Sequence, residues 1–216
     1  MAQDLPLGEM ALVSPPLPSL EQPPSQPLVL GVLASGSGTN FGAILRAIEA
    51  GELSARVAVL IYNNPEAIVS ARAMEAGIPT AFLNHRDFAS REDLDGAIVA
   101  TLQAYGVSHV VMAGWMRIVT PVLIAAYPHR MINIHPSLLP AFKGIRAIEQ
   151  ALAAQVKLTG CTVHLVEERV DSGPILMQAA VPILPGDTVD SLHARIQRQE
   201  HRILPAALQR LALGLS

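Results

Sequence analysis

Cysteine and charge are both scarce in this sequence, and each scarcity excludes a class of protein. Only one of the 216 residues, Cys161, is a cysteine, so no internal disulfide can form and a reducing compartment, the cytoplasm, is expected. The net charge is -3 and no basic block occurs, which argues against nucleic acid as the main partner. No apolar run reaches the roughly 18 residues of a membrane span, and the amino terminus lacks the basic start and apolar core of a secretory signal.

Hydrophobic residues make up 50% of the chain, which is enough for a core of normal size in one domain. Residues 1–27 differ from the rest, because prolines interrupt them repeatedly among Ser and Gln and no apolar period is present that could bury a face. We therefore expect residues 1–27 to be a disordered, proline-rich tail and residues 28–216 to be the folded domain.

From residue 28 onward, short apolar runs alternate with segments of helical spacing. The apolar runs predict parallel strands at 28–33, 57–62, 79–83, 109–113 and 131–134. This alternation predicts an α/β fold, in which helices cover both faces of a mainly parallel, twisted sheet. Two later runs, 162–166 and 174–181, predict an antiparallel strand pair, and the last helix is expected to kink or end at Pro205.

A glycine-rich turn, residues 34–40, joins the first strand to a helix. Glycines let the backbone approach a ligand closely, and the first amides of a helix favour an anion. A dinucleotide site would need an acid after the second strand, but asparagines stand there, at 63–64. We therefore favour a single phosphate at Gly38, Thr39 and Asn40. A plain tight turn, with Thr39 or Asn40 as the helix cap, remains the alternative.

The stretch that organises the chain is 133–140, Asn-Ile-His-Pro-Ser-Leu-Leu-Pro. Asn133 and His135 lie two residues apart at the end of a strand that Pro136 terminates, so their side chains share one face. In open α/β sheets, ligands bind at such carboxyl ends. On its own the pattern is more often a capping asparagine and a surface histidine.

Several further residues have an ordinary structural interpretation when they are considered alone. Asp171, in a loop somewhat long for a hairpin, is either a turn residue or a carboxylate aimed at His135. Arg91, at a helix start, is solvated unless it binds a carboxylate. Trp115 and Met116 are core unless they wall a pocket for a flat ring, and Glu200 is a solvated helix residue unless a pocket lies beside it.

Together, separated signals resemble one family. The matching segments are 35–40, 113–117, 133–140, 160–178 and 199–201. They are similar to the phosphoribosylglycinamide formyltransferases, folate-dependent enzymes of purine synthesis, and the resemblance covers about residues 28–212. The Asn-x-His-Pro-Ser-Leu-Leu-Pro segment with a downstream Asp-x-Gly-Pro is specific to folate formyltransferases as a group, and the phosphate turn and short length select this family.

The resemblance implies a site and its ligands. It implies a Rossmann-like, phosphate-binding half at 28–128 and a catalytic and folate-binding half at 129–216. It implies formyl transfer from 10-formyltetrahydrofolate to 5'-phosphoribosylglycinamide without a metal, by a monomer or homodimer. The implied residues are Asn133, His135 and Asp171 for catalysis; Gly38, Thr39 and Asn40 for the phosphate; Glu200 for the glycinamide substrate; and Arg91, Met116, Arg117, Ile118, Val119 and Asn133 for folate. One departure is Ile148, where many relatives carry a histidine.

The chemistry of formyl transfer agrees with these residue types. An amine attacks the formyl carbon, and the oxygen becomes negative in a tetrahedral intermediate. Asn133 and a protonated His135 can donate hydrogen bonds to that oxygen, while an ionised Asp171 would raise the imidazole pKa and orient the ring. No activated Ser or Cys is recognisable, so direct transfer is expected, and the histidines are too scattered for metal-ligand spacing.

Two other functions remain open at this stage. Another folate enzyme, one that formylates initiator tRNA or hydrolyses formylfolate, would be expected to carry an RNA-binding extension or a regulatory domain, and neither is recognisable here. A non-catalytic nucleotide-binding module would keep the glycine-rich turn but has no reason to keep Asn133, His135 and Asp171 together.

Overall fold

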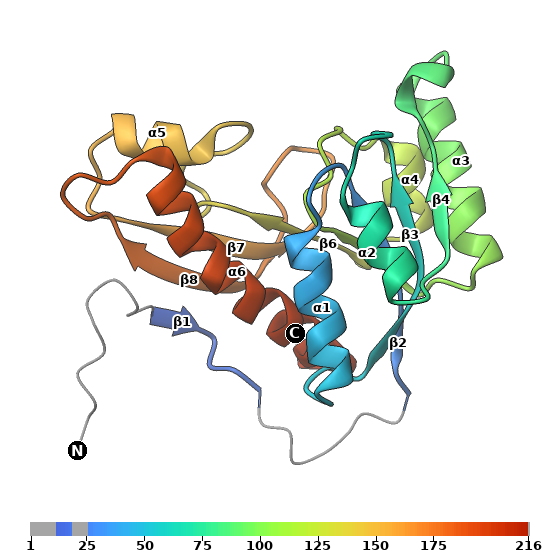
Figure 1. Ribbon diagram of the computed structural model, residues 1–216, viewed down its shortest axis with the longest axis horizontal. Helices are drawn as coiled ribbons and strands as arrows, with labels where there is room; N and C mark the ends of the chain where they lie inside the picture. The colour runs from blue at the N-terminus through green and yellow to red at the C-terminus, as the bar shows by residue number, and fades with distance from the viewer. Residues whose placement is uncertain (1–11, 19–25, 216) are drawn as a thin grey trace.

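The computed structural model describes residues 12–18 and 26–215, and this part of the chain folds around one sheet of eight strands (Figure 1). The strands are β1 (Leu12–Ser14), β2 (Leu28–Ala34), β3 (Ala55–Tyr62), β4 (Thr80–Phe82), β5 (His109–Met112), β6 (Met131–His135), β7 (Leu158–Leu165) and β8 (Ile175–Pro182). The helices are α1 (Thr39–Glu49), α2 (Val69–Glu75), α3 (Arg91–Ala104), α4 (Pro121–Ala126), α5 (Ala147–Ala153) and α6 (Val189–Ala212), with a short 3-10 turn, η1, at His85–Asp87.

The strand order is β1-β8-β7-β6-β5-β2-β3-β4. The strands from β6 to β4 are parallel neighbours, whereas β6, β7, β8 and β1 pair antiparallel. The predicted mainly parallel sheet with a carboxyl-terminal antiparallel pair is therefore confirmed. β7 begins at Leu158, four residues before the predicted strand, because its pairing with β8 extends to Pro182.

Helices cover both faces of the sheet because side chains alternate along each strand. On β2, Val32 faces one core together with Ile44 of α1 and Ile196 of α6, and Leu33 faces the other core together with Ile98 of α3. Each of these side chains is fully buried, and such burial stabilises a fold by roughly 1.5–3 kcal/mol per side chain.

The structure differs from the sequence prediction for part of residues 1–27. Residues 12–14 form β1, which pairs antiparallel with β8 so that Leu12 lies opposite Ala180. Val13 also packs against the main core. A strand of three residues is too short to show an alternation of apolar and polar side chains, so the composition of this segment suggested disorder. In the structure, the edge of β8 supplies hydrogen-bond partners for its backbone. The rest of that prediction falls on 1–11 and 19–25, which lie outside the described residues.

Of the two outcomes expected for the last helix at Pro205, a kink or an end, the structure excludes the end, because α6 continues past Pro205 to Ala212. Pro205 is buried, and its neighbours Ile203, Leu204 and Leu208 on the same helix belong to the main core. The missing hydrogen bond at one proline is therefore offset by the apolar face that the continued helix buries.

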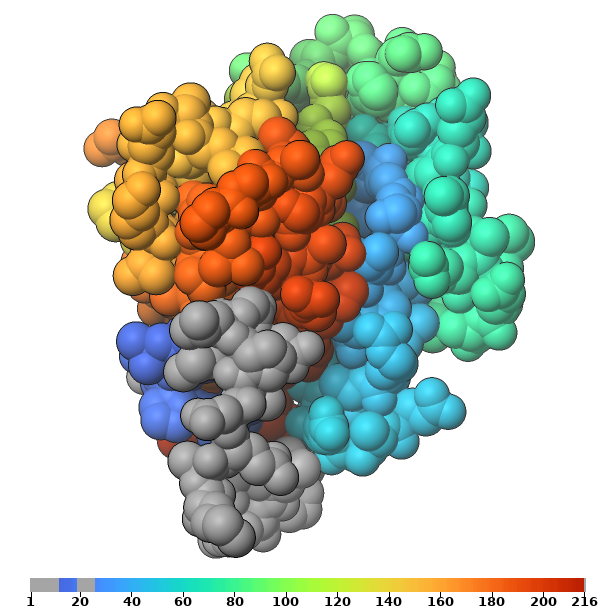
Figure 2. Space-filling model, turned by 60° about the vertical axis from the view of Figure 1, so that its left-hand side comes forward, coloured from blue at the N-terminus to red at the C-terminus, as the bar shows by residue number. Residues whose placement is uncertain are grey.

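α6 is central to the position of the site. In Figure 2 its orange-red surface lies between the amber surface around α5 and the blue surface of α1, and it packs against both helices. The first half of α6, with His193, Gln197 and Glu200, lies beside the glycine-rich turn at the carboxyl edge of the parallel strands, whereas Gln209 near its end contacts Ser54 just before β3. No helix in the described ranges combines the length and the apolar character required to cross a lipid bilayer.

Candidate active site

Two adjoining pockets lie where β2, β5 and β6 end, at one edge of the sheet. The first, of about 290 Å³, is lined by the glycine-rich turn and one face of α6. The second, of about 480 Å³, is lined by residues 114–119, the end of β6 and the 166–171 loop. The two pockets share Gly114, Met116, Ile134 and Pro136, so ligands in both would meet beside the end of β6.

His135 and Asp171 lie together in the second pocket. His135 Nδ1 is 3.3 Å from Asp171 Oδ2, and both side chains are only 7% exposed. His135 Nε2 is 2.8 Å from the Phe142 carbonyl, to which it donates, and the Gly144 amide donates to Asp171 Oδ2 at 2.7 Å. The Asp171 carboxylate is therefore held in place by the His135 imidazole and by the Gly144 amide. This arrangement agrees with the interpretation of Asp171 as a carboxylate aimed at His135.

Sequence reasoning missed His164, which joins Asn133 to this cluster. His164 Nδ1 donates to the Leu165 carbonyl at 2.8 Å, which leaves Nε2 to accept from Asn133 Nδ2 at 3.1 Å. The same Nε2 is 3.6 Å from Asp171 Oδ1. Asn133 and His164 lie opposite each other on the paired strands β6 and β7. Only this pairing reveals the role of His164, and the sequence pattern of one strand does not show which residue lies opposite on the next.

The surroundings of Asp171 favour its ionised form. Burial alone would raise the pKa of this carboxyl, but His164 beside it, the hydrogen bond from the Gly144 amide and the nearby His135 together lower the pKa below its ordinary value. Asp171 is therefore a carboxylate at neutral pH and can stabilise positive charge on either imidazole.

Two residues of the cluster have left-handed backbone conformations. Asp171 has φ 49° and Phe142, whose carbonyl accepts from His135, has φ 53°. Non-glycine residues rarely adopt this region, and doing so costs roughly 1–3 kcal/mol unless the surroundings enforce it. The hydrogen bonds to His135 and Gly144 are the surroundings that hold this geometry.

The glycine-rich turn is not capped by a side chain, so the alternative with Thr39 or Asn40 as helix cap is wrong. Gly38 is the N-cap of α1, with φ 70° and no side-chain cap. The two side chains instead reach α6: Gln197 Nε2 donates to Thr39 Oγ1 at 3.0 Å, and Asn40 Nδ2 donates to Glu200 Oε2 at 2.9 Å. The first amides of α1 thus face the first pocket without a side-chain cap.

Glu200 is buried in the first pocket rather than solvated, with 6% of its surface exposed. Burial raises the pKa of this carboxyl, while the hydrogen bond from Asn40 and the nearby His193 act against the increase. His193 and Gln197 line the same pocket. Sequence reasoning did not single them out, although their spacing from Glu200 places all three on one face of α6.

The residues predicted for the folate site divide into two groups. Met116, Arg117, Ile118 and Val119 all line the second pocket, and Met116 and Ile118 are 75% and 56% exposed. Arg91 lies apart: it is exposed at the start of α3 and lines neither pocket. The structure therefore does not bring Arg91 together with the rest.

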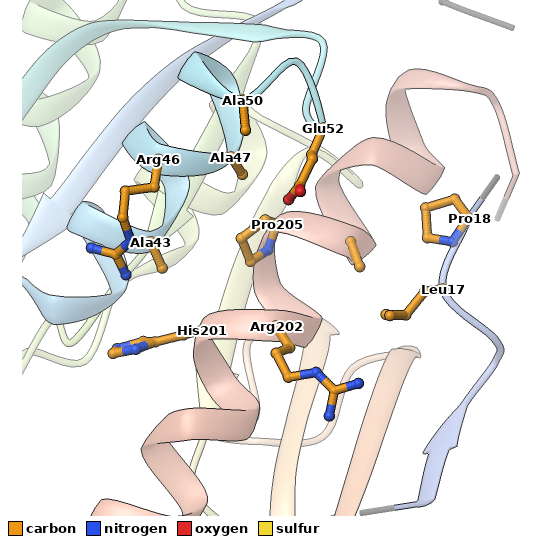
Figure 3. Close-up of a pocket in the computed structure, with 11 residues that line it drawn as sticks. Leu17, Pro18, Ala43, Arg46, Ala47, Ala50, Glu52, His201, Arg202 and Pro205 are labelled. Carbon is orange, nitrogen blue, oxygen red and sulfur yellow. The ribbon is translucent and has the colours of Figure 1, made fainter. Parts of the chain in front are cut away.

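Two further features lie outside the two pockets. Ile148, the departure from the family pattern, lines neither of them and is buried in the main core at 7% exposure. A separate cavity of about 530 Å³ lies between α1, α6 and Leu17-Pro18, and Arg46, His201 and Arg202 are among the residues that line it (Figure 3). Over the ranges that the structure describes, no three His, Cys, Asp or Glu side chains gather in a way that could hold a metal ion.

Comparison with known proteins agrees with this geometry. The family model described as formyl transferase matches residues 29–208. This chain belongs to the formyl transferase family. The match spans the glycine-rich turn, both pockets and the Asn133, His135 and Asp171 cluster.

Three individual proteins show how similar this chain is to other members of the family. Phosphoribosylglycinamide formyltransferase of Bacillus subtilis is 40% identical over 86% of this chain and 94% of its own length. Glycinamide ribonucleotide transformylase 1 from Symbiobacterium toebii has a structure with a TM-score of 0.87 and 48% identity, covering 88% of this chain and 90% of that one. The human trifunctional purine biosynthetic protein adenosine-3 is 43% identical, but the match spans only 18% of its length and 86% of this chain.

Proposed function

We propose that this member of the formyl transferase family transfers the formyl group of 10-formyltetrahydrofolate to the amine of 5'-phosphoribosylglycinamide, a step of purine synthesis. The observation that carries the proposal is the pair of adjoining pockets, one with an anion-binding turn and one with a buried amide, imidazole and carboxylate. The relatives of similar length named for this reaction support it.

The first pocket suits the phosphorylated amine. The backbone amides at Gly38, Thr39 and Asn40 would bind the ribose phosphate, because a helix start carries unsatisfied N–H groups and positive potential. Glu200, fixed by Asn40, would accept a hydrogen bond from the glycinamide end. The amine would then point past Gly114 and Met116 into the second pocket.

The second pocket suits the folate. Met116, Ile118 and Val119 supply apolar walls for a flat ring, and Met112, Gly114 and Trp115 extend them. Asn133 and His135 lie at the junction with the first pocket, where the formyl carbon must meet the amine. Arg91 remains a proposed ligand for the far, acidic end of the folate, from its exposed position at the start of α3.

In the transfer step, the amine lone pair forms a bond to the formyl carbon and the carbonyl electrons move to its oxygen. Asn133 Nδ2 donates one of its two N–H groups to His164, so the second N–H would donate to that oxygen. His135 makes both its contacts within the protein, and it would donate to the oxygen once the oxygen replaces the Phe142 carbonyl.

Collapse of the intermediate breaks the bond from the formyl carbon to the folate nitrogen. The attacking nitrogen must lose one proton and the leaving nitrogen must gain one. The ionised Asp171 would accept the first proton, directly or through a water, a protonated His135 would give one proton to the leaving nitrogen, and Asp171 would then reprotonate His135 at Nδ1. Cys161 takes no part because it is fully buried, so we propose direct transfer without an acyl-enzyme.

The compartment and assembly belong to the same proposal. Within the described chain the one thiol is free and buried, which suits the cytoplasm, where this reaction's small-molecule substrates would be found. We propose that a monomer or a homodimer is active, since both pockets are lined by a single chain.

The test is identification of the product with a ¹³C-labelled formyl donor. We expect the label to leave 10-formyltetrahydrofolate and appear as an N-formyl amide on 5'-phosphoribosylglycinamide, with no change when a chelator is added. Label in formate, at the same rate with and without the amine, would instead identify a formylfolate hydrolase.

A further inference from the structure

The cavity between α1 and α6, of about 530 Å³, lies outside both pockets of the proposed active site (Figure 3). Small side chains of the two helices, with Leu17-Pro18 beside them, form its apolar walls. None of the described residues that line this cavity also lines either active-site pocket. Its volume lies within the roughly 300–1,000 Å³ that is usual for small-molecule sites, so the cavity is large enough for a ligand of its own.

One side of this cavity is cationic. Figure 3 shows the Arg46 side chain of α1 and the His201 ring of α6 on the same side. Over the described ranges, no carboxylate lies within 4.0 Å of the Arg46 guanidinium, and the buried His201 Nε2 has no hydrogen-bond partner. Burial, and then the positive charge of Arg46, lower the pKa of His201. Since buried polar groups are normally paired, this side suits a ligand that brings negative charge and acceptor atoms.

Arg202 and Glu52 are the other charged residues described at the cavity. Arg202 donates to Gln199 Oε1 at 2.8 Å and adds to the positive charge. Glu52 forms no ion pair within the described chain, and Figure 3 shows its carboxylate on the side of Pro205, away from the His201 ring. A hydrocarbon ligand would remove water from this carboxylate without replacing the hydrogen bonds, which is unfavourable. The apolar part of the ligand should therefore carry an N–H donor.

We propose that this cavity binds a mononucleotide whose base carries an exocyclic amino group. A phosphate has three terminal oxygens, so it can accept from Arg46 on α1 and from His201 on α6 together. A carboxylate has only two oxygens, and one guanidinium already occupies both when it binds in the bidentate manner. The flat base would lie between Ala47 and Pro205, with its amino group donating to Glu52, and the ribose would join the two polar ends.

Binding at this cavity can be tested apart from the proposed reaction, because it requires no turnover. Isothermal titration calorimetry would measure Kd for adenosine 5'-monophosphate, with 5'-phosphoribosylglycinamide present at saturation to occupy the first pocket. We expect one nucleotide to bind per chain. Purine riboside 5'-monophosphate, which lacks only the amino group, should bind roughly fivefold more weakly because it offers no donor to Glu52.

Two exposed residues of the cavity, Arg46 and Glu52, allow variants that should leave the fold intact. Arg46→Gln should raise Kd for adenosine 5'-monophosphate at least about tenfold, since a charge-assisted hydrogen bond is lost. Glu52→Ala should make the two nucleotides bind equally without weakening purine riboside 5'-monophosphate, a change that damage to the fold would not produce. Arg56→Gln makes the matched charge change on an exposed residue of β3 that lines none of the three sites, and should leave both Kd values within about twofold.

The outcomes distinguish this inference from the proposed function. Absence of nucleotide binding, with formyl transfer intact, would overturn the inference and leave the proposed function standing. Equal affinity for the two nucleotides in the unaltered protein, or an affinity that survives in Arg46→Gln, would place the nucleotide elsewhere and would also overturn it. Absence of formyl transfer, with nucleotide binding as expected, would refute the proposed function alone.

Discussion

At the scale of single residues, the site combines groups whose protonation is set by burial and by hydrogen bonds. Asp171 is held ionised by His164, Gly144 and His135 despite its burial. Glu200 is buried with one hydrogen bond, from Asn40, and its pKa is raised. The two carboxyls thus have different roles in the proposed reaction, one as a base near the formyl carbon and one as a substrate acceptor.

Sequence reasoning found Asn133, His135 and Asp171 because their segments are distinctive, but it could not place them. The distance from His135 to Asp171 depends on how the 167–173 loop folds back, and that loop relies on a left-handed Asp171. His164 was missed because its function arises from pairing across β6 and β7. Contacts between segments that are distant in the sequence depend on tertiary packing, and a local sequence pattern does not reveal that packing.

Glu200→Gln should raise stability and weaken substrate binding. Because the folded-state pKa of Glu200 is raised, ionising it opposes folding; this penalty is absent below its unfolded pKa and grows as pH rises through the folded pKa. The amide keeps an oxygen for Asn40 but carries no charge. We expect Tm at pH 7 to rise by a few degrees and KM for 5'-phosphoribosylglycinamide to rise roughly tenfold.

Thermal melts across pH check the stability effect, and initial rates at varied substrate check KM. The Tm difference between Glu200→Gln and the unaltered protein should vanish as pH falls below about 4. A variant less stable than the unaltered protein at pH 7 would show that the Glu200 charge supports the fold.

At the scale of elements, sequence patterns predicted the parallel strands and most helices, because apolar runs and helical spacing report which faces are buried. They did not predict β1, whose three residues gain their structure from the edge of β8. They left open whether α6 would kink or end at Pro205, and the helix continues because the apolar face that it buries outweighs one lost hydrogen bond. In both places tertiary contacts override a local rule.

The start of α6 depends on Asp187, which accepts from both terminal nitrogens of Arg195, from Ser191 Oγ and from the Leu184 amide. The hydrogen bonds from Arg195 are the main cause that lowers the pKa of Asp187 to about 2. Asp187→Asn leaves Arg195 as a buried cation without its counter-charge. We expect a loss of roughly 2–4 kcal/mol in unfolding free energy, measured by urea denaturation near pH 7.

The prediction also specifies how the stabilisation by Asp187 should change with pH. A lowered folded-state pKa means that the Asp187 contribution is present above about pH 4 and is lost as pH falls towards 2. The advantage over Asp187→Asn should therefore shrink in that window. Asp190→Asn, the same change on an exposed residue of the same helix turn, should have little effect, and an equal loss there would point to the helix dipole instead.

At the scale of the whole molecule, the sheet is extended at one edge by residues far from it in sequence. β1 covers the edge of β8, and Val13 packs against the main core, whereas both proposed active-site pockets lie at the ends of the parallel strands. Deleting residues 1–27 should therefore lower Tm by several degrees and leave kcat within about twofold.

Differential scanning calorimetry and steady-state rates on the truncated protein test this separation. Val13→Asp in the full chain should lower Tm in the same direction, since it buries a charge at the same contact. An unchanged Tm for both proteins would mean that β1 adds nothing to the stability of the sheet.

The central claim is that Asn133, His135 and Asp171 act together in direct formyl transfer. The most direct test is the single-turnover rate of Asp171→Asn with both substrates saturating, because saturation separates the chemical step from binding. Loss of one positioned acid–base group typically costs roughly 10²–10⁴ in rate, and we predict a fall in that range with the melting temperature nearly unchanged. A chemical step within about threefold of the unaltered protein would contradict the claim and make Asp171 only a residue of the turn.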